Sequence, residues 1–93
     1  MIKTFADKRS AAIFSGSVTK GLTADLVKRA KVNMDLTNAA ATLDFLRSPP
    51  GNRLEARKDD RTGQHSIRVN DQWRICFVWR NEDAYDVEFC DCH

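Results

Sequence analysis

Five ionisable side chains in the second half of the chain have the types that cleavage of a phosphodiester bond needs. They are Glu55, Lys58, Arg74, Asp91 and His93. Such cleavage needs a base for a ribose 2′-hydroxyl, cations for the phosphorane-like transition state, and an acid for the leaving oxygen. We therefore hypothesise that these side chains converge near one edge of a sheet, although spacing alone does not establish it.

Each of these side chains also has a purely structural interpretation. A histidine at a chain end is usually solvated, so position alone gives His93 no chemical role. Arg74, next to Trp73, suits a surface ion pair equally well, and Glu55 and Lys58 suit solvated charges on a strand. For Trp73, a place in the core is favoured over stacking on a nucleobase.

Three cysteines raise the question of a metal site or a nucleophile. Cys90, Cys92 and His93 lie close in the sequence, and Cys76 could supply a fourth ligand. Zinc sites usually contain two ligand pairs from separate loops, and this chain has no second pair. Nothing in the sequence orients Cys92 as a catalytic thiolate. We predict reduced thiols, buried at Cys76 and Cys90, and no metal or cofactor.

The length and composition of the chain indicate one globular unit. It has 93 residues, 42% of them hydrophobic and 30% charged. No stretch approaches the roughly 18 apolar residues that span a bilayer, and the opening residues lack the apolar run of a signal peptide. We expect a single domain over residues 1–93, with no membrane segment and a cytoplasmic location.

Positive charge is concentrated in the middle of the chain although the net charge is only +2. Residues 53–80 contain four acidic and seven basic residues, the basic ones being Arg53, Arg57, Lys58, Arg61, Arg68, Arg74 and Arg80. Guanidinium groups suit phosphate because they donate two parallel hydrogen bonds. Charge alone, however, favours the interpretation that these are ordinary surface arginines.

The first half of the chain has helical periodicity. Residues 7–14 predict a short helix, and Thr23 is a plausible N-cap for a longer one that continues through Met34. A further helix is predicted through Leu43 and Leu46. The last two helices would form an antiparallel pair that covers one face of a sheet.

The second half has the period of two that is typical of strands. Two prolines and a glycine within residues 48–52 stop the helical pattern. Four strand candidates follow, at residues 53–58, 64–69, 73–79 and 85–89. Short polar turns between them favour an antiparallel meander. The predicted class is α+β, with N-terminal helices packed on a curved antiparallel β-sheet.

Alternation also assigns side chains to the two faces of the sheet. In the last strand, one face should carry Tyr85, Val87, Phe89, Asp91 and His93. In the preceding strand, Arg74 faces away from Trp73. In the first strand, Glu55 shares a face with Arg53 and Arg57.

Several segments resemble the HigB toxins of the RelE/ParE superfamily. They are PPGNRLE at 49–55, GQHSIRVNDQWRICF at 63–77, DAYDVE at 83–88 and the terminal Asp91-x-His93. The opening residues 1–5 are similar too, so the resemblance covers nearly the whole chain. The combination of NDQWR with the Asp-x-His terminus is far more specific than one short motif.

The resemblance implies a RelE-like fold and an endoribonuclease toxin of a type II toxin–antitoxin system. Such a toxin enters the A site of the small (30S) ribosomal subunit and cleaves mRNA during translation without a metal. Lys58 and Arg74 correspond to the groups that stabilise the phosphate and the transition state. Asp91 and His93 correspond to the C-terminal catalytic pair, with His93 as the proton-transfer group. Glu55 would be a base or a supporting residue.

The resemblance also implies partners. A HigA-like helix-turn-helix antitoxin would bind the toxin, and operator DNA would be bound only through that antitoxin. Four arginines would hold ribosomal RNA or the message through phosphate contacts, namely Arg53, Arg57, Arg61 and Arg68.

Two positions depart from the family pattern. Cys92 stands where the family usually has tyrosine, which could stack on a codon base, and Asp59 replaces a usual glycine. Two alternatives therefore stay open: a non-catalytic ParE-like inhibitor of DNA gyrase, and a catalytically weakened toxin that still binds its antitoxin.

Overall fold

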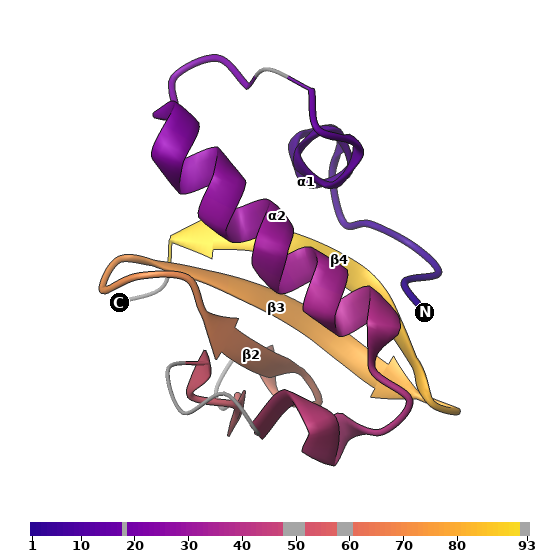
Figure 1. Ribbon diagram of the computed structural model, residues 1–93. Coiled ribbons are helices and arrows are strands. Elements are labelled where there is room, and N and C mark those ends of the chain that lie inside the picture. The colour runs from indigo at the N-terminus through magenta and orange to yellow at the C-terminus, as the bar shows by residue number, and fades with distance from the viewer. Residues whose placement is uncertain (18, 48–51, 58–60, 92–93) are drawn as a thin grey trace.

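Two helices lie across one face of a four-stranded antiparallel sheet in the computed structural model (Figure 1). The structure describes residues 1–17, 19–47, 52–57 and 61–91. Its elements are α1 (Lys8–Ser15), α2 (Ala24–Ala39), the 3-10 helix η1 (Leu43–Arg47), β1 (Glu55–Ala56), β2 (His65–Arg68), β3 (Trp73–Arg80) and β4 (Asp83–Asp91). The α+β class predicted from the sequence is confirmed.

Short polar caps fix the start of both helices. The Asp7 carboxylate accepts a hydrogen bond from the Ser10 amide at 2.7 Å, and the Thr23 hydroxyl accepts one from Leu26 at 3.2 Å. Each cap satisfies a backbone donor that the first turn of a helix leaves without a partner. Gly16 ends α1 with φ 84°, a conformation that favours glycine. Thr23 was predicted as the cap of the longer helix, and that prediction is confirmed.

The predicted helix through Leu43 and Leu46 is not an α-helix. Helix α2 ends at Ala39, and Ala40 is already extended, with ψ 123°. Leu43 and Leu46 instead belong to η1, where residues three apart lie above one another on the same side. The two helices that cover the sheet are therefore α1 and α2.

The sheet is a meander in the order β1-β2-β3-β4, as the sequence predicts. Its first strand is shorter than the predicted range 53–58: among the described residues 52–57, Glu55 and Ala56 are the ones that pair with β2. Arg53, just before it, has φ 46°, which does not continue an extended strand. The N-terminal segment adds two isolated parallel bridges beside β4, from Ile2 and Phe5.

A bulge in β4 changes which side chains reach the core. At Asp86 (φ 52°) β4 has one residue more than the opposite stretch of β3. An extra residue reverses the alternation, so Tyr85 does not share a face with Val87 and Phe89. Ala84 fills the core position instead and is fully buried. The predicted common face of Tyr85, Val87 and Phe89 is therefore wrong at Tyr85.

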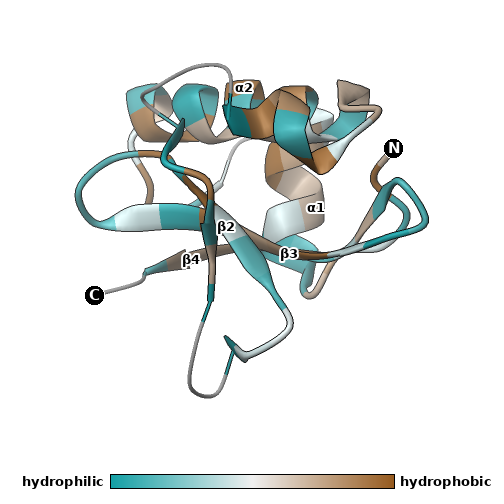
Figure 2. Cartoon of the chain, turned by 90° about the horizontal axis from the view of Figure 1, so that it is seen from below, coloured by the Kyte–Doolittle hydropathy of each residue, from teal (hydrophilic) through white to brown (hydrophobic). Residues whose placement is uncertain are grey.

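The core lies between the helices and the sheet. Its largest fully buried side chains are Ile13, Met34, Leu46, Ile67, Ile75, Phe77, Val87 and Phe89. Figure 2 shows hydrophobic residues (brown) along the helices and the central strands. Among the residues that the structure describes, no helix combines the length and apolar content that crossing a membrane needs.

Candidate functional site

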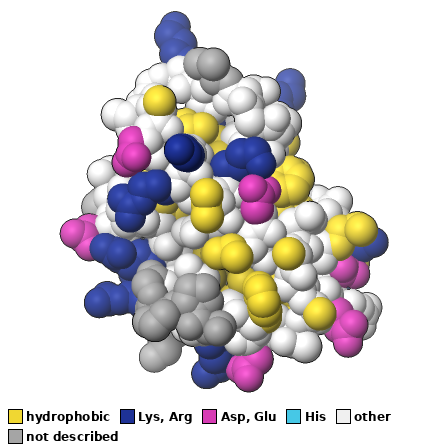
Figure 3. Space-filling model, in the orientation of Figure 1, with side chains coloured by type: hydrophobic (Ala, Val, Ile, Leu, Met, Phe, Trp, Pro, Cys, Tyr) yellow, Lys and Arg dark blue, Asp and Glu magenta, His cyan; other side chains and the backbone are white. Residues whose placement is uncertain are grey.

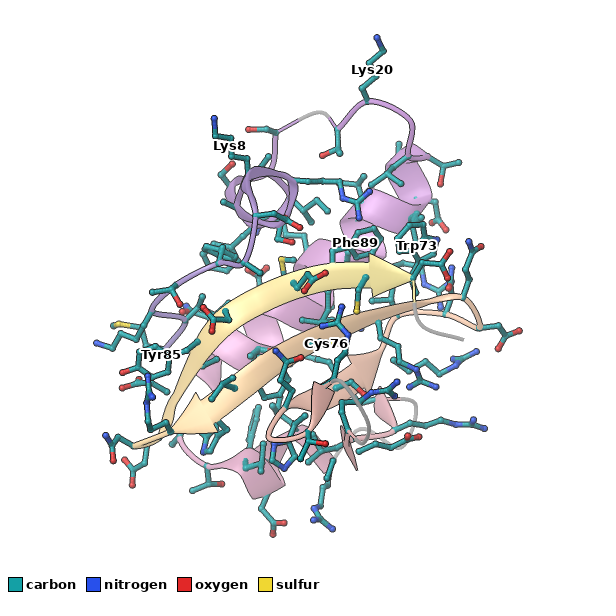
Figure 4. The ribbon with its side chains drawn as sticks, turned by 180° about the vertical axis from the view of Figure 1, so that it is seen from behind. Lys8, Lys20, Trp73, Cys76, Tyr85 and Phe89 are labelled. Carbon is teal, nitrogen blue, oxygen red and sulfur yellow. The ribbon has the colours of Figure 1, made fainter. Side chains whose placement is uncertain are left out.

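Polar side chains gather on the face of the sheet that points away from α2 (Figure 4). The β2–β3 register places Arg68 directly opposite Arg74, so the two point to the same side. Cys90 of β4 lies opposite Arg74 on its other flank. Like charges directly opposite one another destabilise a sheet unless an anion compensates them. This row of arginines is therefore a candidate anion site.

The Arg74 guanidinium has an available donor. Its Nη1 is buried and makes no hydrogen bond to any residue that the structure describes. Trp73, its neighbour, points to the opposite side and packs on Phe89, as predicted from alternation. Because a buried donor without a partner is costly, an incoming oxyanion would relieve that cost.

Arg68 is held at the site by an ion pair. Its Nη2 donates to a carboxylate oxygen of Asp71 in the turn between β2 and β3. The same interaction lowers the pKa of Asp71, first through the hydrogen bond and then through the charge of Arg68. Asp71 itself is fully exposed, so a phosphate that approaches Arg68 meets a partner that can move into solvent.

Glu55 of β1 lies on the same face of the sheet as Arg68 and Arg74. It is opposite Ser66, a fully buried residue whose hydroxyl makes no hydrogen bond within the described part of the chain. An Arg57 nitrogen lies 4.0 Å from the Glu55 carboxylate, which confirms that these two side chains share a face. The half-exposed Glu55 carboxylate is thus accessible from solvent beside the arginine row.

Arg61 forms a two-pronged ion pair rather than a free cationic surface. Its two terminal nitrogens donate to the two carboxylate oxygens of Glu88, both at 3.2 Å. The hydrogen bond to Glu88 raises the pKa of Arg61. A phosphate would have to compete with Glu88 for this arginine.

Asp91 is not on the face that carries Arg74. It lies opposite Trp73 at the end of β4 and accepts a hydrogen bond from Gln72 Nε2 at 3.1 Å. The structure thus brings Arg74, Arg68 and Glu55 to one face and places Asp91 at the rim of the other. Lys58 and His93 lie outside the described residues.

The comparison with protein families shows which family the chain belongs to. The model of the RelE-like toxin HigB of type II toxin–antitoxin systems matches residues 3–93. The chain belongs to the HigB-like toxin family. The Endoribonuclease HigB of Proteus vulgaris is 34% identical over 93 residues, which cover all of both chains. The Toxin HigB-1 of Vibrio cholerae is 44% identical over 46 residues, half of this chain and 48% of the relative.

Solved structures agree with this family at the level of the fold. A YoeB–YefM complex from Staphylococcus aureus contains a chain that superposes with a TM-score of 0.63 and 13% identity. The match covers 100% of this chain and 98% of the other. The RelE-like architecture predicted from the sequence is therefore confirmed.

The C-terminal strand of this HigB-like toxin is anchored by Arg9 of α1. Trp73 and Phe89 stack at 4.4 Å with an interplanar angle of 6°, and the Arg9 guanidinium lies 5.5 Å from the Trp73 ring. Arg9 Nη2 also donates to the Phe89 carbonyl at 3.1 Å. Trp73 packs against the core, as predicted. The role of Arg9 was missed because only the tertiary structure brings α1 to the end of β4.

The two described cysteines are buried thiols, as the sequence predicts. The hydrogen bond with Cys76 raises the pKa of the Cys90 thiol, and burial raises it further. Cys90 is therefore held as a protonated thiol at neutral pH, and it must lose its proton before it can react. Among the described residues no three groups lie together as metal ligands. Cys92 lies outside them.

His65 couples the fold to pH. It lies next to the Phe77 ring, and burial, followed by the charge of Arg47, lowers its pKa below 6.5. The unfolded chain therefore binds more protons as the pH falls below 6.5, and stability is lost as the pH falls towards the folded pKa. Lowering the pH from about 7.5 to about 5.5 should reduce the denaturant midpoint more in the parent than in His65→Gln. Parallel pH curves for the two proteins would contradict this.

Proposed function

We propose that this endoribonuclease toxin cuts messenger RNA in the A site of the 30S ribosomal subunit, in the cytoplasm. The observation that supports the proposal is the juxtaposition of Arg68 and Arg74, with a buried and available donor on Arg74. A scissile phosphate bound there would accept hydrogen bonds from a planar guanidinium. Stabilisation of the transition state at such a site is typically the largest catalytic term.

In the proposed reaction the ribose 2′-oxygen attacks the adjacent phosphorus. A base removes the 2′-hydroxyl proton, the bond to the 5′-oxygen breaks, and an acid protonates that oxygen. The products are a 2′,3′-cyclic phosphate and a 5′-hydroxyl end. Arg74 and Lys58 would stabilise the charge on the non-bridging oxygens, and Glu55, Asp91 and His93 are the candidates for proton transfer, with His93 preferred.

The position of Glu55 supports a role on the entering side of the reaction. Its carboxylate is half exposed and lies on the face of Arg68 and Arg74, whereas Asp91 lies on the other face. A single phosphate on the arginine row would therefore lie on the same side of the sheet as Glu55. Asp91, at the strand end beside Gln72, would take part in proton transfer from the rim of the other face.

RNA backbone would extend from the phosphate site along the predicted arginines, Arg53, Arg57, Arg61 and Arg68. A hollow of about 430 Å³ between α2 and the end of β2 is lined by Lys28, Arg29 and Arg68. On the face that α2 presents, Figure 3 shows Lys and Arg side chains gathered on the left of the view. We propose Lys28 and Arg29 as additional phosphate contacts. In the sequence they are indistinguishable from solvated charges on a helix.

We also propose that a HigA-like helix-turn-helix antitoxin binds and inhibits this toxin, and that the pair binds operator DNA through the antitoxin. Membership of a family named for type II toxin–antitoxin systems supports an antitoxin partner. The solved Staphylococcus aureus neighbours are likewise complexes of a toxin with its antitoxin. Co-expression with a HigA-like protein, followed by co-purification, would test this partner.

The test is to express the chain from a tightly regulated promoter and to map mRNA 5′ ends with and without a translation inhibitor. We expect new 5′-hydroxyl ends in frame with codons, and their loss when ribosomes are cleared from the message. Cuts that persist without translation would contradict ribosome dependence. Growth arrest without new ends, with loss of DNA supercoiling, would instead favour a gyrase inhibitor.

A further inference from the structure

Two cysteines from neighbouring strands meet on the site face of the sheet. Cys76 of β3 lies opposite Glu88, and Cys90 of β4 lies opposite Arg74, so the cysteines are diagonal neighbours on one face. Their sulfur atoms are 2.8 Å apart, and Figure 4 shows where Cys76 lies on β3. The pair therefore joins the two longest strands next to the proposed phosphate site.

The geometry is close to that of a disulfide. A disulfide bond has a sulfur–sulfur distance of about 2.03–2.05 Å, so the two atoms need to approach by less than about 1 Å. Both cysteines belong to paired strands, so the strand pairing already holds them together. Cys90 also donates a weak hydrogen bond to the Arg74 carbonyl at 3.7 Å. No large backbone movement separates the thiols from a bond.

The surroundings make packing alone an incomplete explanation. Cys76 and Cys90 are 0% and 5% exposed, yet the residues around them are polar: Glu88 and Arg61 form their ion pair beside them, and Ser66 lies opposite Cys76. A thiol that served only as a small apolar filler would be expected on the helix side with the other core residues. Two adjacent thiols on the polar side instead have redox chemistry available to them.

We propose that Cys76 and Cys90 form a dithiol–disulfide couple that exchanges with low-molecular-weight disulfides such as glutathione disulfide. The Cys90 thiol, the more exposed of the two, first loses its proton to the solvent. The resulting thiolate attacks the small disulfide and forms a mixed disulfide, releasing one small thiol. The Cys76 thiolate then displaces the second small thiol. The protein loses two electrons and two protons, and the small disulfide is reduced to two thiols.

The bond would join β3 to β4 beside Arg74. Disulfide formation and folding are linked equilibria. If the bond forms more readily in the folded chain than in the unfolded chain, then it stabilises the folded state by the same factor. The proposal that Cys76 and Cys90 form a redox couple rests on the distance between their sulfur atoms and does not depend on the proposed RNA cleavage. Its test reads thiols directly, so a failed nuclease assay would not affect it.

The experiment uses the full chain with Cys92→Ser, which leaves only Cys76 and Cys90 as thiols. The protein is equilibrated in glutathione buffers of increasing disulfide content and quenched in acid. It is then unfolded in neutral guanidinium chloride that contains N-ethylmaleimide and weighed as an intact protein. We expect a conversion from two labels to none, with a peptide that links Cys76 to Cys90. Excess dithiothreitol should restore both labels.

Native structure should favour the bond strongly. We expect half-oxidation of the folded chain at a glutathione disulfide content at least about tenfold lower than that needed by the same chain in urea. In matched controls, Cys76→Ser and Cys90→Ser, the remaining cysteine should yield no intramolecular bond. If a control fails to fold, the comparison between the folded and urea-unfolded Cys92→Ser chain still decides the question.

Two results would overturn the proposal. One is persistence of both labels in the folded chain under conditions that oxidise the urea-unfolded chain, which would mean that the thiols are inert packing. The other is a glutathione adduct on either cysteine without the linked peptide, which would mean that the sulfur atoms do not approach each other in solution.

Discussion

Arg74→Ala is expected to reduce the rate of mRNA cleavage by about 10²–10³-fold, the effect of removing one preorganised donor from a developing oxyanion. In the structure this guanidinium lies next to Arg68 and has a buried nitrogen that contacts no described acceptor. Alanine removes both the charge and the fork of donors. The measurement is the rate at which a defined message is cut in reconstituted translation.

The conservative variant Arg74→Lys distinguishes the effect of the positive charge from the effect of the planar guanidinium. Arg74→Lys keeps the cation but loses the planar pair of donors, so its rate should lie between those of the parent and of Arg74→Ala. Arg80→Ala is the matched control, because Arg80 lies on the same strand, is exposed, and stacks on Tyr85 at 4.4 Å. Its rate should stay within about twofold of the parent, as for a surface substitution. A rate for Arg74→Ala within about tenfold of the parent would remove Arg74 from the catalytic role.

Phe89→Ala should destabilise the folded chain by about 3–5 kcal/mol, the usual cost of removing a buried phenylalanine. Phe89 is fully buried, stacks on Trp73 at 4.4 Å and accepts a hydrogen bond from Arg9 on its carbonyl. Domains of this size are stable by only about 5–15 kcal/mol. The variant should therefore unfold at a much lower urea concentration, with loss of the far-ultraviolet circular dichroism signal.

Phe45→Ala provides the control for that measurement. Phe45 lies in η1 and is 46% exposed, so its truncation creates no internal cavity. Its free energy of unfolding should match that of the parent within about 0.5 kcal/mol. Equal losses in the two variants would show that the Phe89 side chain is not packed in the core between β4 and α1.

Local sequence signals decided much of the architecture and the chemistry of this chain. Helix caps at Asp7 and Thr23, and the switch from helical to two-residue periodicity near residue 50, specify which segments are helices and which are strands. Alternation within one strand also placed Arg74 on the face opposite Trp73. These signals are local, because a backbone conformation fixes where each neighbouring side chain points. The residues that resemble HigB toxins further identified the family, which the comparison confirmed.

Only the tertiary structure decided which residues of different segments meet. The pairing of Arg68 with Arg74, the contact between Cys76 and Cys90, and the anchoring of Phe89 by Arg9 all depend on register between segments distant in sequence. The bulge at Asp86 likewise has no local marker, yet it moves Tyr85 out of the core face. Register is set by the summed burial and hydrogen bonding of whole strands, and one extra residue reverses every side chain beyond it. The periodicity of a single strand carries no information about the register between strands or about the position of a bulge.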